Sequence, residues 1–144
     1  MIVSCISVNA QMTREDSKKI DTLEVKKQPY TLKQVAQAII QVESGGNPKA
    51  YNPVGNCAGI MQITPSCVKQ CNIWLQNAKS KKRYTLQDRF NKTKSLEIFY
   101  MVQSHYNKDG DIERSIRVWN GGPGFTRRGT QKYYEKVMKK LKSS

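Results

Sequence analysis

The chain has 144 residues, enough for one domain that buries a core of its own. It carries 25 Lys and Arg against 11 Asp and Glu, and its formal net charge is +14. This excess predicts attraction to a polyanion: a nucleic acid, an anionic membrane, or the anionic polymers of a bacterial wall. No known nucleic-acid motif accompanies the basic residues, so the net charge is the only feature that supports a nucleic acid as the partner.

The first residues resemble part of an export signal. Residues 1–11 are apolar but too short to span a membrane, and they end in small residues that resemble a cleavage site. The Ile2–Cys5 run also resembles the lipidation box of a bacterial lipoprotein, although neither signal is complete. Residues 12–28 are polar and charged without a sustained period. We therefore expect a signal remnant and flexible tether at 1–28, a domain at 29–144, and export from the cytoplasm.

The stretch Thr31–Ser44 predicts a helix with one carboxylate on its apolar side. Thr31 and Gln34 form a capping box at its start, and Gly45 suits the left-handed turn that ends a helix. Apolar residues recur at spacings of three and four, and Glu43 falls on the same face. Burial would raise the pKa of this carboxyl, and a Glu that stays protonated near neutral pH suits a general acid. The alternative is a helix-end Glu whose head reaches water.

Four further helices are predicted downstream. Residues 45–63 are rich in Gly, Asn and Pro and predict loop and short extended structure. Thr64 and Pro65 suit the N-cap and first position of the next helix, Asp111 can cap a later one, and the GGPG run at Gly121–Gly124 excludes helix. The predicted helices cover Thr64–Ala78, about Ser95–Tyr106, a segment after Asp111 with Ile112, Ile116 and Trp119 inward, and about Thr130–Leu141.

Four motifs follow one another along the chain: Glu43-Ser44-x-x-x-Pro48-x-Ala50-x-Asn52, Gly59-Ile60-Met61-Gln62-Ile63-x-Pro65, Trp119-Asn120-Gly121-Gly122-Pro123-Gly124, and Thr130-x-x-Tyr133-x-x-Lys136-Val137. Together they resemble the soluble lytic transglycosylase domain, which is related in fold to goose-type lysozyme. The resemblance covers about Thr31–Val137. It implies an α+β, predominantly α, lysozyme-like fold with a helical core and a short loop or β-hairpin region after the catalytic helix.

The same resemblance assigns roles to individual residues. Glu43 would be the single catalytic acid and then the base, and no cofactor or metal is implied. The hydroxyl of Tyr133 would lie near the Glu43 carboxyl. The residues that would bind substrate are Ser44, Asn52, Met61, Gln62, Trp119, Asn120 and Tyr133. Two departures from the family pattern stand out: Trp119 replaces a commoner Tyr, and Cys57 lengthens the loop before Gly59 by one residue.

The spacing of acidic residues bears on the reaction. Cleavage of a glycosidic bond normally takes two carboxylates, but no Asp or Glu occurs between Glu43 and Asp88. A substrate-assisted reaction needs only one, because the N-acetyl oxygen and the O6 hydroxyl of the sugar act in place of the second carboxylate. The alternatives are a hydrolytic lysozyme of the same fold, in which Asp88, Glu97 or Asp109 approaches Glu43 in space, and a non-catalytic peptidoglycan-binding assembly protein.

The four cysteines are Cys5, Cys57, Cys67 and Cys71. An even number in a short, exported chain suggests disulfides, with three possible pairings. We favour one disulfide from Cys57 to the following helix. A zinc site is not favoured, because the single His105 and the thiols lack metal-ligand spacing, and we expect a surface or core role for this histidine.

The expected partners follow from charge and resemblance together. They are the glycan strands of peptidoglycan and the anionic polymers of the cell wall, with no specific nucleic acid. The chain is expected to act as a monomer in the periplasm, at the outer surface or outside the cell, or after delivery by a phage to a host wall. Components of a secretion, conjugation or phage assembly are further candidate partners.

Overall fold

The computed structural model of the protein describes residues 29–144. Within this range the chain forms five α-helices, one 3-10 helix and a two-stranded hairpin, so the predicted α+β, predominantly α fold class is confirmed. None of the described helices is long and apolar enough to cross a membrane. The predictions for residues 1–28, Cys5 included, lie outside the described residues. The elements are α2 Leu32–Ser44, β1 Tyr51–Asn52, β2 Cys57–Ala58, α3 Pro65–Asn77, η1 Leu86–Phe90, α4 Lys92–Tyr106, α5 Ile112–Gly121 and α6 Arg127–Lys142.

Helix α2 begins and ends where the sequence predicts. The Thr31 backbone N–H donates to Gln34 Oε1 at 2.8 Å, and the Gln34 N–H donates back to Thr31 Oγ1 at 3.2 Å. The capping box is therefore present. Gly45 ends the helix with φ 61°, a left-handed conformation that glycine adopts without steric cost. These caps fix the last turn, which carries Glu43.

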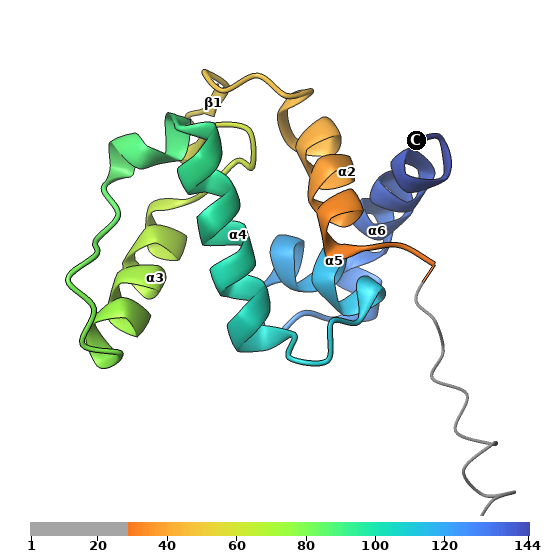
Figure 1. Ribbon diagram of the computed structural model, residues 1–144. Helices are drawn as coiled ribbons and strands as arrows, with labels where there is room; N and C mark the ends of the chain where they lie inside the picture. Colours follow the sequence, from red (N-terminus) through yellow and green to blue (C-terminus); the bar gives the residue numbers. More distant parts are fainter. Residues whose placement is uncertain (1–28) are drawn as a thin grey trace, which may run out of the picture.

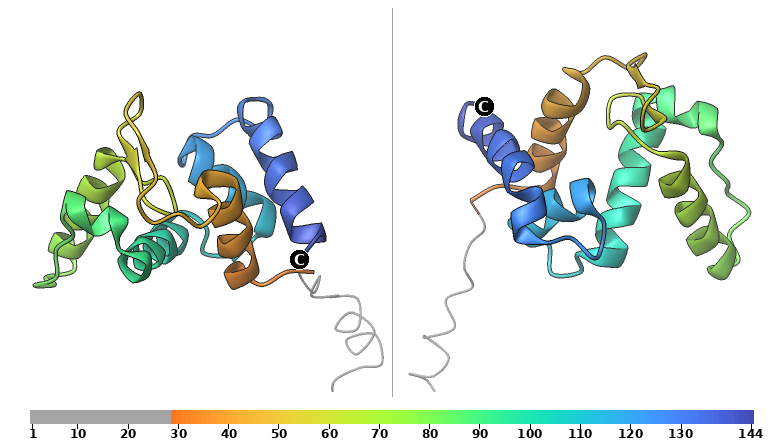
Figure 2. Two further views of the ribbon diagram at one scale, coloured as in Figure 1. Left: turned by 90° about the horizontal axis from the view of Figure 1, so that it is seen from above. Right: turned by 180° about the vertical axis from the view of Figure 1, so that it is seen from behind.

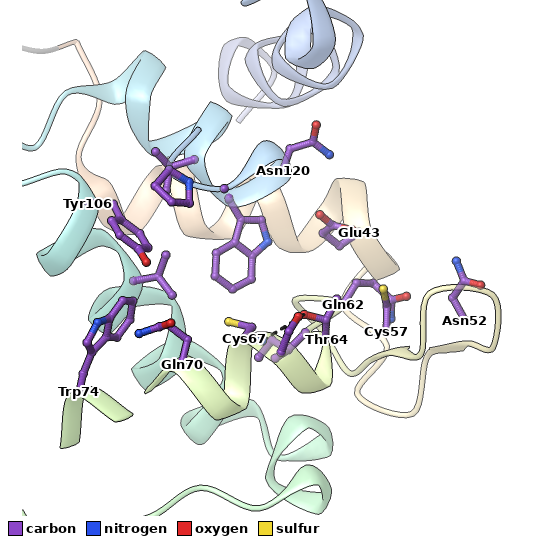
Figure 3. A pocket seen from close by; sticks show the side chains of 17 residues that line it. Glu43, Asn52, Cys57, Gln62, Thr64, Cys67, Gln70, Trp74, Tyr106 and Asn120 are labelled. Atoms are coloured by element: carbon purple, nitrogen blue, oxygen red, sulfur yellow. Dashed lines mark hydrogen bonds between the residues drawn. The ribbon is translucent and has the colours of Figure 1, made fainter. Parts of the chain in front are cut away.

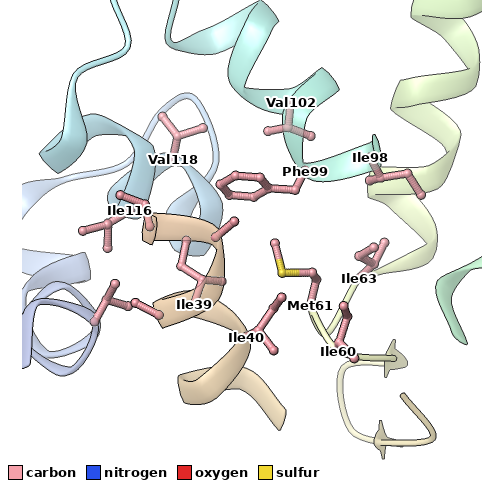
Figure 4. Packing of buried hydrophobic residues seen from close by; sticks show 14 of the residues in the cluster. Ile39, Ile40, Ile60, Met61, Ile63, Ile98, Phe99, Val102, Ile116 and Val118 are labelled. Atoms are coloured by element: carbon pink, nitrogen blue, oxygen red, sulfur yellow. The ribbon is translucent and has the colours of Figure 1, made fainter. Parts of the chain in front are cut away.

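The helices are arranged around α4. In Figure 1, α4 lies between α3 on one side and the group of α2, α5 and α6 on the other, and the view from behind in Figure 2 shows the same order. Side chains from α2, α4, α5 and the loop after β2 meet in one apolar core (Figure 4). The largest of its fully buried side chains are Ile39, Met61, Ile63, Ile98, Phe99 and Ile116. This core holds the end of α2 and the loop after β2 against each other.

The hairpin is small and depends on a buried arginine. β1 and β2 pair antiparallel, with Tyr51 opposite Ala58. Arg89 in η1 is 5% exposed, and its Nη1 donates to the carbonyls of Asn56 at 2.6 Å and Ile63 at 3.1 Å. Gly59 has φ 77°, and a Cβ there would lie 1.7 Å from the Arg89 carbonyl oxygen, so only glycine permits this contact. The sequence patterns gave no signal for η1 or for its contact with the hairpin.

Two helices begin earlier than their apolar spacing predicts. Asn91 caps α4 through a side-chain bond from the Lys94 N–H, so the helix begins at Lys92 and not near Ser95. Thr126 caps α6 in the same way, so this helix begins at Arg127, three residues before the predicted start. Polar N-cap side chains stabilise a first turn that carries no buried residue, so periodicity alone does not detect it.

Candidate active site

A cavity of about 470 Å³ opens beside the end of α2. Its lining comes from α2, the hairpin, α3, α4 and the end of α5. Glu43 and Asn52 lie toward one end, and Trp74 and Tyr106 lie toward the other (Figure 3). The cavity is therefore an elongated cleft with a carboxyl group at one end and aromatic side chains at the other.

Glu43 is held in a partly buried position. The Tyr133 hydroxyl on α6 donates to Glu43 Oε1 at 2.6 Å. Burial raises the pKa of the Glu43 carboxyl, and the hydrogen bond from Tyr133 opposes part of that rise. The carboxyl therefore keeps its proton to a higher pH than an ordinary Glu, as the apolar-face position of this residue predicts.

The two tandem tyrosines of α6 face in different directions. Tyr133 reaches the carboxyl of Glu43, and burial together with the nearby Glu43 carboxylate raises the pKa of its hydroxyl. This hydroxyl therefore remains a hydrogen-bond donor at neutral pH. Tyr134 packs its ring against the guanidinium of Arg117, with Cζ 4.3 Å from the ring centroid.

The hairpin supplies neutral polar groups to the cleft. Asn52 and Cys57 are paired across the hairpin, and both line the cavity. Gln62 also lines it, in a left-handed conformation with φ 49°. Its amide nitrogen donates to the backbone oxygens of Gly59 at 3.0 Å and Ala50 at 3.3 Å. These bonds engage the amide N–H groups and leave the side-chain oxygen to accept from a ligand.

Trp119 and Asn120, near the end of α5, also line the cleft as the resemblance implies. Trp119 packs its ring edge-on against Phe99 of the core, with centroids 5.2 Å apart. This contact fixes the indole between the core and the cavity. Asn120 is exposed and lies in the last turn of α5.

Three of the residues expected to bind substrate, Ser44, Met61 and Tyr133, do not line the cleft, and Tyr133 instead contacts the Glu43 carboxyl. Met61 is fully buried in the core, because the chain reverses at Gln62 and turns the thioether inward (Figure 4). Ser44 donates its hydroxyl to the Ile60 carbonyl at 2.9 Å and accepts from the Gly46 N–H at 3.1 Å. It therefore ties the end of α2 to the loop after β2.

The aromatic end of the cleft was not predicted as part of the site. Helical spacing with apolar neighbours favours a core face for Trp74 and Tyr106, yet both are partly exposed and line the cavity. Trp74 stacks on His105, with ring centroids 3.9 Å apart, and Tyr106 meets it edge-on at 5.2 Å. His105 is exposed, so of the expected surface or core role the structure shows the surface one. Periodicity cannot separate a core aromatic from one at the rim of a cleft.

Glu43 is the one carboxyl group among the described residues that line the cavity. Asp88 binds Lys94 Nζ at 2.7 Å and Glu97 binds Lys82 Nζ at 2.6 Å, and these lysines hold the pKa of both acids below the usual range. Asp109 is exposed in the turn after α4 and does not line the cavity either. The acids that could have partnered Glu43 in space therefore lie elsewhere.

The predicted disulfide from Cys57 to the following helix is not formed. Cys57, Cys67 and Cys71 all have free thiols. The neighbour of the Cys67 thiol is Cys71 on the same helix, and the Cys57 thiol lies 3.5 Å from the Gly55 carbonyl. Across residues 29–144, no group of three His, Cys, Asp or Glu side chains is arranged to hold a metal ion.

Comparison with known proteins agrees with this fold. The family described as "Transglycosylase SLT domain" matches residues 22–142, so the chain belongs to the SLT transglycosylase domain family. The 70 kDa soluble lytic transglycosylase of Escherichia coli shares the fold, with 18% sequence identity and a TM-score of 0.52 over 77% of this chain. The chain covers 17% of the length of that protein. No curated protein matches the chain.

Proposed function

We propose that this protein is a peptidoglycan lytic transglycosylase that cleaves the β-1,4 bond between N-acetylmuramic acid and N-acetylglucosamine. The single observation that carries the proposal is the environment of Glu43. Burial raises its pKa, Tyr133 holds it in place, and the described lining of the cleft contains no other carboxyl group. One acid without a partner suits a reaction in which the substrate supplies the second group.

In the first step Glu43 donates its proton to the glycosidic oxygen as the bond to C1 of the muramic acid breaks. Positive charge develops at C1, and the N-acetyl oxygen of the same sugar stabilises it. Glu43 is left as a carboxylate. The Tyr133 hydroxyl, 2.6 Å away, stabilises that anion, because a hydrogen bond to an ionised group is stronger than one to a neutral group.

In the second step the Glu43 carboxylate takes the proton from the O6 hydroxyl of the muramic acid, and O6 attacks C1. A 1,6-anhydro ring forms, and Glu43 regains its proton for the next cycle. The O6 hydroxyl belongs to the same molecule as C1, so its effective concentration exceeds that of solvent water. Asn52, Gln62 and Asn120 would orient the sugars by neutral hydrogen bonds, which do not depress the pKa of Glu43 as cations would.

The wider role follows from charge. With a net charge of +14, the chain would concentrate on the phosphate and carboxylate polymers of a bacterial wall. Helix α6 presents exposed Lys136, Lys139, Lys140 and Lys142. We propose an exported monomer, or one delivered by a phage, that opens the wall for remodelling, for assembly of a secretion or conjugation apparatus, or for lysis.

The test is clearance of purified peptidoglycan by wild-type protein and by the Glu43→Gln variant. Gln has nearly the same shape but cannot deliver a proton, so we expect turnover to fall by about 100- to 10,000-fold. Wall binding and the unfolding transition should remain. Glu97→Gln is the matched control, since that carboxyl pairs with Lys82 away from the cleft. A Glu43→Gln variant that keeps most of its activity would show that Glu43 is not the acid.

A further inference from the structure

Two cysteines lie one helical turn apart in the wall of the cleft. Cys67 is in the first turn of α3, where its backbone N–H donates to the N-cap hydroxyl of Thr64 at 3.2 Å. It is partly exposed and lines the cavity (Figure 3). Cys71 lies behind it, fully buried in the core. One thiol is therefore open to the cleft and the other is shielded.

The two cysteines are four residues apart on one helix, so their side chains are neighbours on the same face, and the thiols differ in character. The interaction between them lowers the pKa of Cys67 and raises the pKa of Cys71. The N-terminal turn of a helix also favours a thiolate. The other thiol that lines the cleft, Cys57, contrasts with Cys67, because burial and the nearby Glu43 carboxylate raise its pKa. Of the two thiols that line the cleft, Cys67 is therefore the better nucleophile.

We propose that Cys67 and Cys71 form a thiol–disulfide exchange site, which reacts with disulfide oxidants that enter the cleft and slows substrate cleavage once oxidised. The Cys67 thiolate attacks one sulfur of an external disulfide, forms a mixed disulfide and expels the other half as a thiolate. Cys71 then gives up its proton, attacks the Cys67 sulfur and expels the second half. The two cysteines lose two electrons in total, and the external disulfide is reduced to two thiols.

Oxidation changes the shape of the cleft wall. Side chains four residues apart on a helix have Cβ atoms roughly 5–6 Å apart, whereas a disulfide requires about 3.5–4.5 Å. The first turn of α3 must therefore draw in by roughly 1–2 Å. Thr64 and Gln70 border this turn and line the same cavity, so they move with it. A misplacement of about 1 Å in a cleft can cost up to roughly 100-fold in rate.

A disulfide between Cys67 and Cys71 can be detected by peptide mapping, because trypsin cleaves after Lys69, which lies between the two cysteines. Trypsin places Cys57 and Cys67 in the peptide 50–69 and Cys71 in the peptide 70–79. The full chain is reduced, freed of reductant, treated with oxidised glutathione and digested without reduction. We expect the two peptides to be joined, in the wild type and equally in Cys57→Ser. Cys71→Ser should instead carry one glutathione on peptide 50–69.

Two results would overturn the proposal: unlinked peptides, or an internal Cys57–Cys67 bond that makes peptide 50–69 lighter by two hydrogens.

The effect on cleavage rests on the proposed function and has its own measurement. Each protein is compared with its own reduced form, and oxidation should lower turnover by about tenfold in wild type and Cys57→Ser but not in Cys67→Ser. If complete oxidation left the wild-type rate unchanged, the proposal that the disulfide slows cleavage would be wrong. Glu43→Gln should form the link as readily, so the thiol chemistry is tested even if the proposed activity fails.

Discussion

The two walls of the cleft are built by different means. The helical wall, formed by α2, α5 and α6, carries Glu43 and Asn120 and is supported by Tyr133. The hairpin wall, formed by the hairpin, the loop after β2 and the start of α3, carries Asn52 and Gln62. The helical wall is held by packed helices. The hairpin wall is held by irregular backbone and by the hydrogen bonds of a buried arginine.

This difference separates two tasks. Burial on the helical wall raises the pKa of Glu43, so in the proposed reaction that wall would set the proton chemistry. The hairpin wall offers neutral amides, whose positions depend on Gly59 and on the Arg89 bonds to Asn56 and Ile63. Changes in the helical wall should therefore alter the pH dependence of the reaction. Changes in the hairpin wall should alter stability and substrate position.

The largest effect on stability is expected from Gly59→Ala in the hairpin wall. The added Cβ would lie 1.7 Å from the Arg89 carbonyl oxygen, so η1 and the hairpin must separate. We expect a loss of about 3 kcal/mol or more in the free energy of unfolding, measured in urea. Gly110→Ala is the control: its φ is also positive, at 67°, but nothing lies within 4 Å of a Cβ there, and roughly 1 kcal/mol is expected. Equal losses would mean that contact between η1 and the hairpin does not hold this wall.

A smaller effect, on rate, is expected from Tyr133→Phe in the helical wall. The variant removes the hydroxyl that stabilises the Glu43 carboxylate, and hydrogen bonds to charged groups contribute about 1.5–3 kcal/mol. Turnover should fall roughly 10- to 100-fold. In wild type the Tyr133 hydrogen bond lowers the pKa of Glu43, so its loss should raise that pKa. The high-pH limb of the plot of turnover against pH should therefore move to higher pH. Tyr134→Phe, which keeps the ring against Arg117, should change neither.

The smallest effect concerns stability and pH. The folded-state pKa of Glu43 lies above its ordinary value of 4.5, so the folded protein binds more protons than the unfolded chain between the two values. Wild type therefore loses stability as pH rises through that window, and Glu43→Gln does not. The stability of the variant relative to wild type should rise with pH above about 4.5.

Glu97→Gln should show the opposite pH dependence of stability relative to wild type in the same measurement. Lys82 and Tyr84 lower the pKa of Glu97 in the folded state, so this carboxylate stabilises the fold above its unfolded pKa and loses that effect as pH falls. Its variant should lose stability relative to wild type as pH rises. If both variants showed the same sign, burial would not be the cause of the raised pKa of Glu43.

The two walls also differ in how far the sequence reveals them. Capping residues and apolar spacing predict α2 and the place of Glu43 on it, since these features are local. The motif order identifies the fold, but it does not predict that the turn at Gln62 buries Met61. Arg89 meets the hairpin from a distant part of the chain, and no local pattern encodes that contact. Distance along the sequence also cannot exclude a second carboxylate in space.

The most direct test of a lone catalytic Glu43 is digestion of peptidoglycan in water enriched in oxygen-18, followed by mass spectrometry of the products. If O6 of the sugar replaces water, the products end in 1,6-anhydro-N-acetylmuramic acid, one water lighter than hydrolysis products and free of oxygen-18 from the solvent. This is the result we predict. Reducing N-acetylmuramic acid ends that carry one oxygen-18 would contradict it, because they require a water activated by a second group in the cleft.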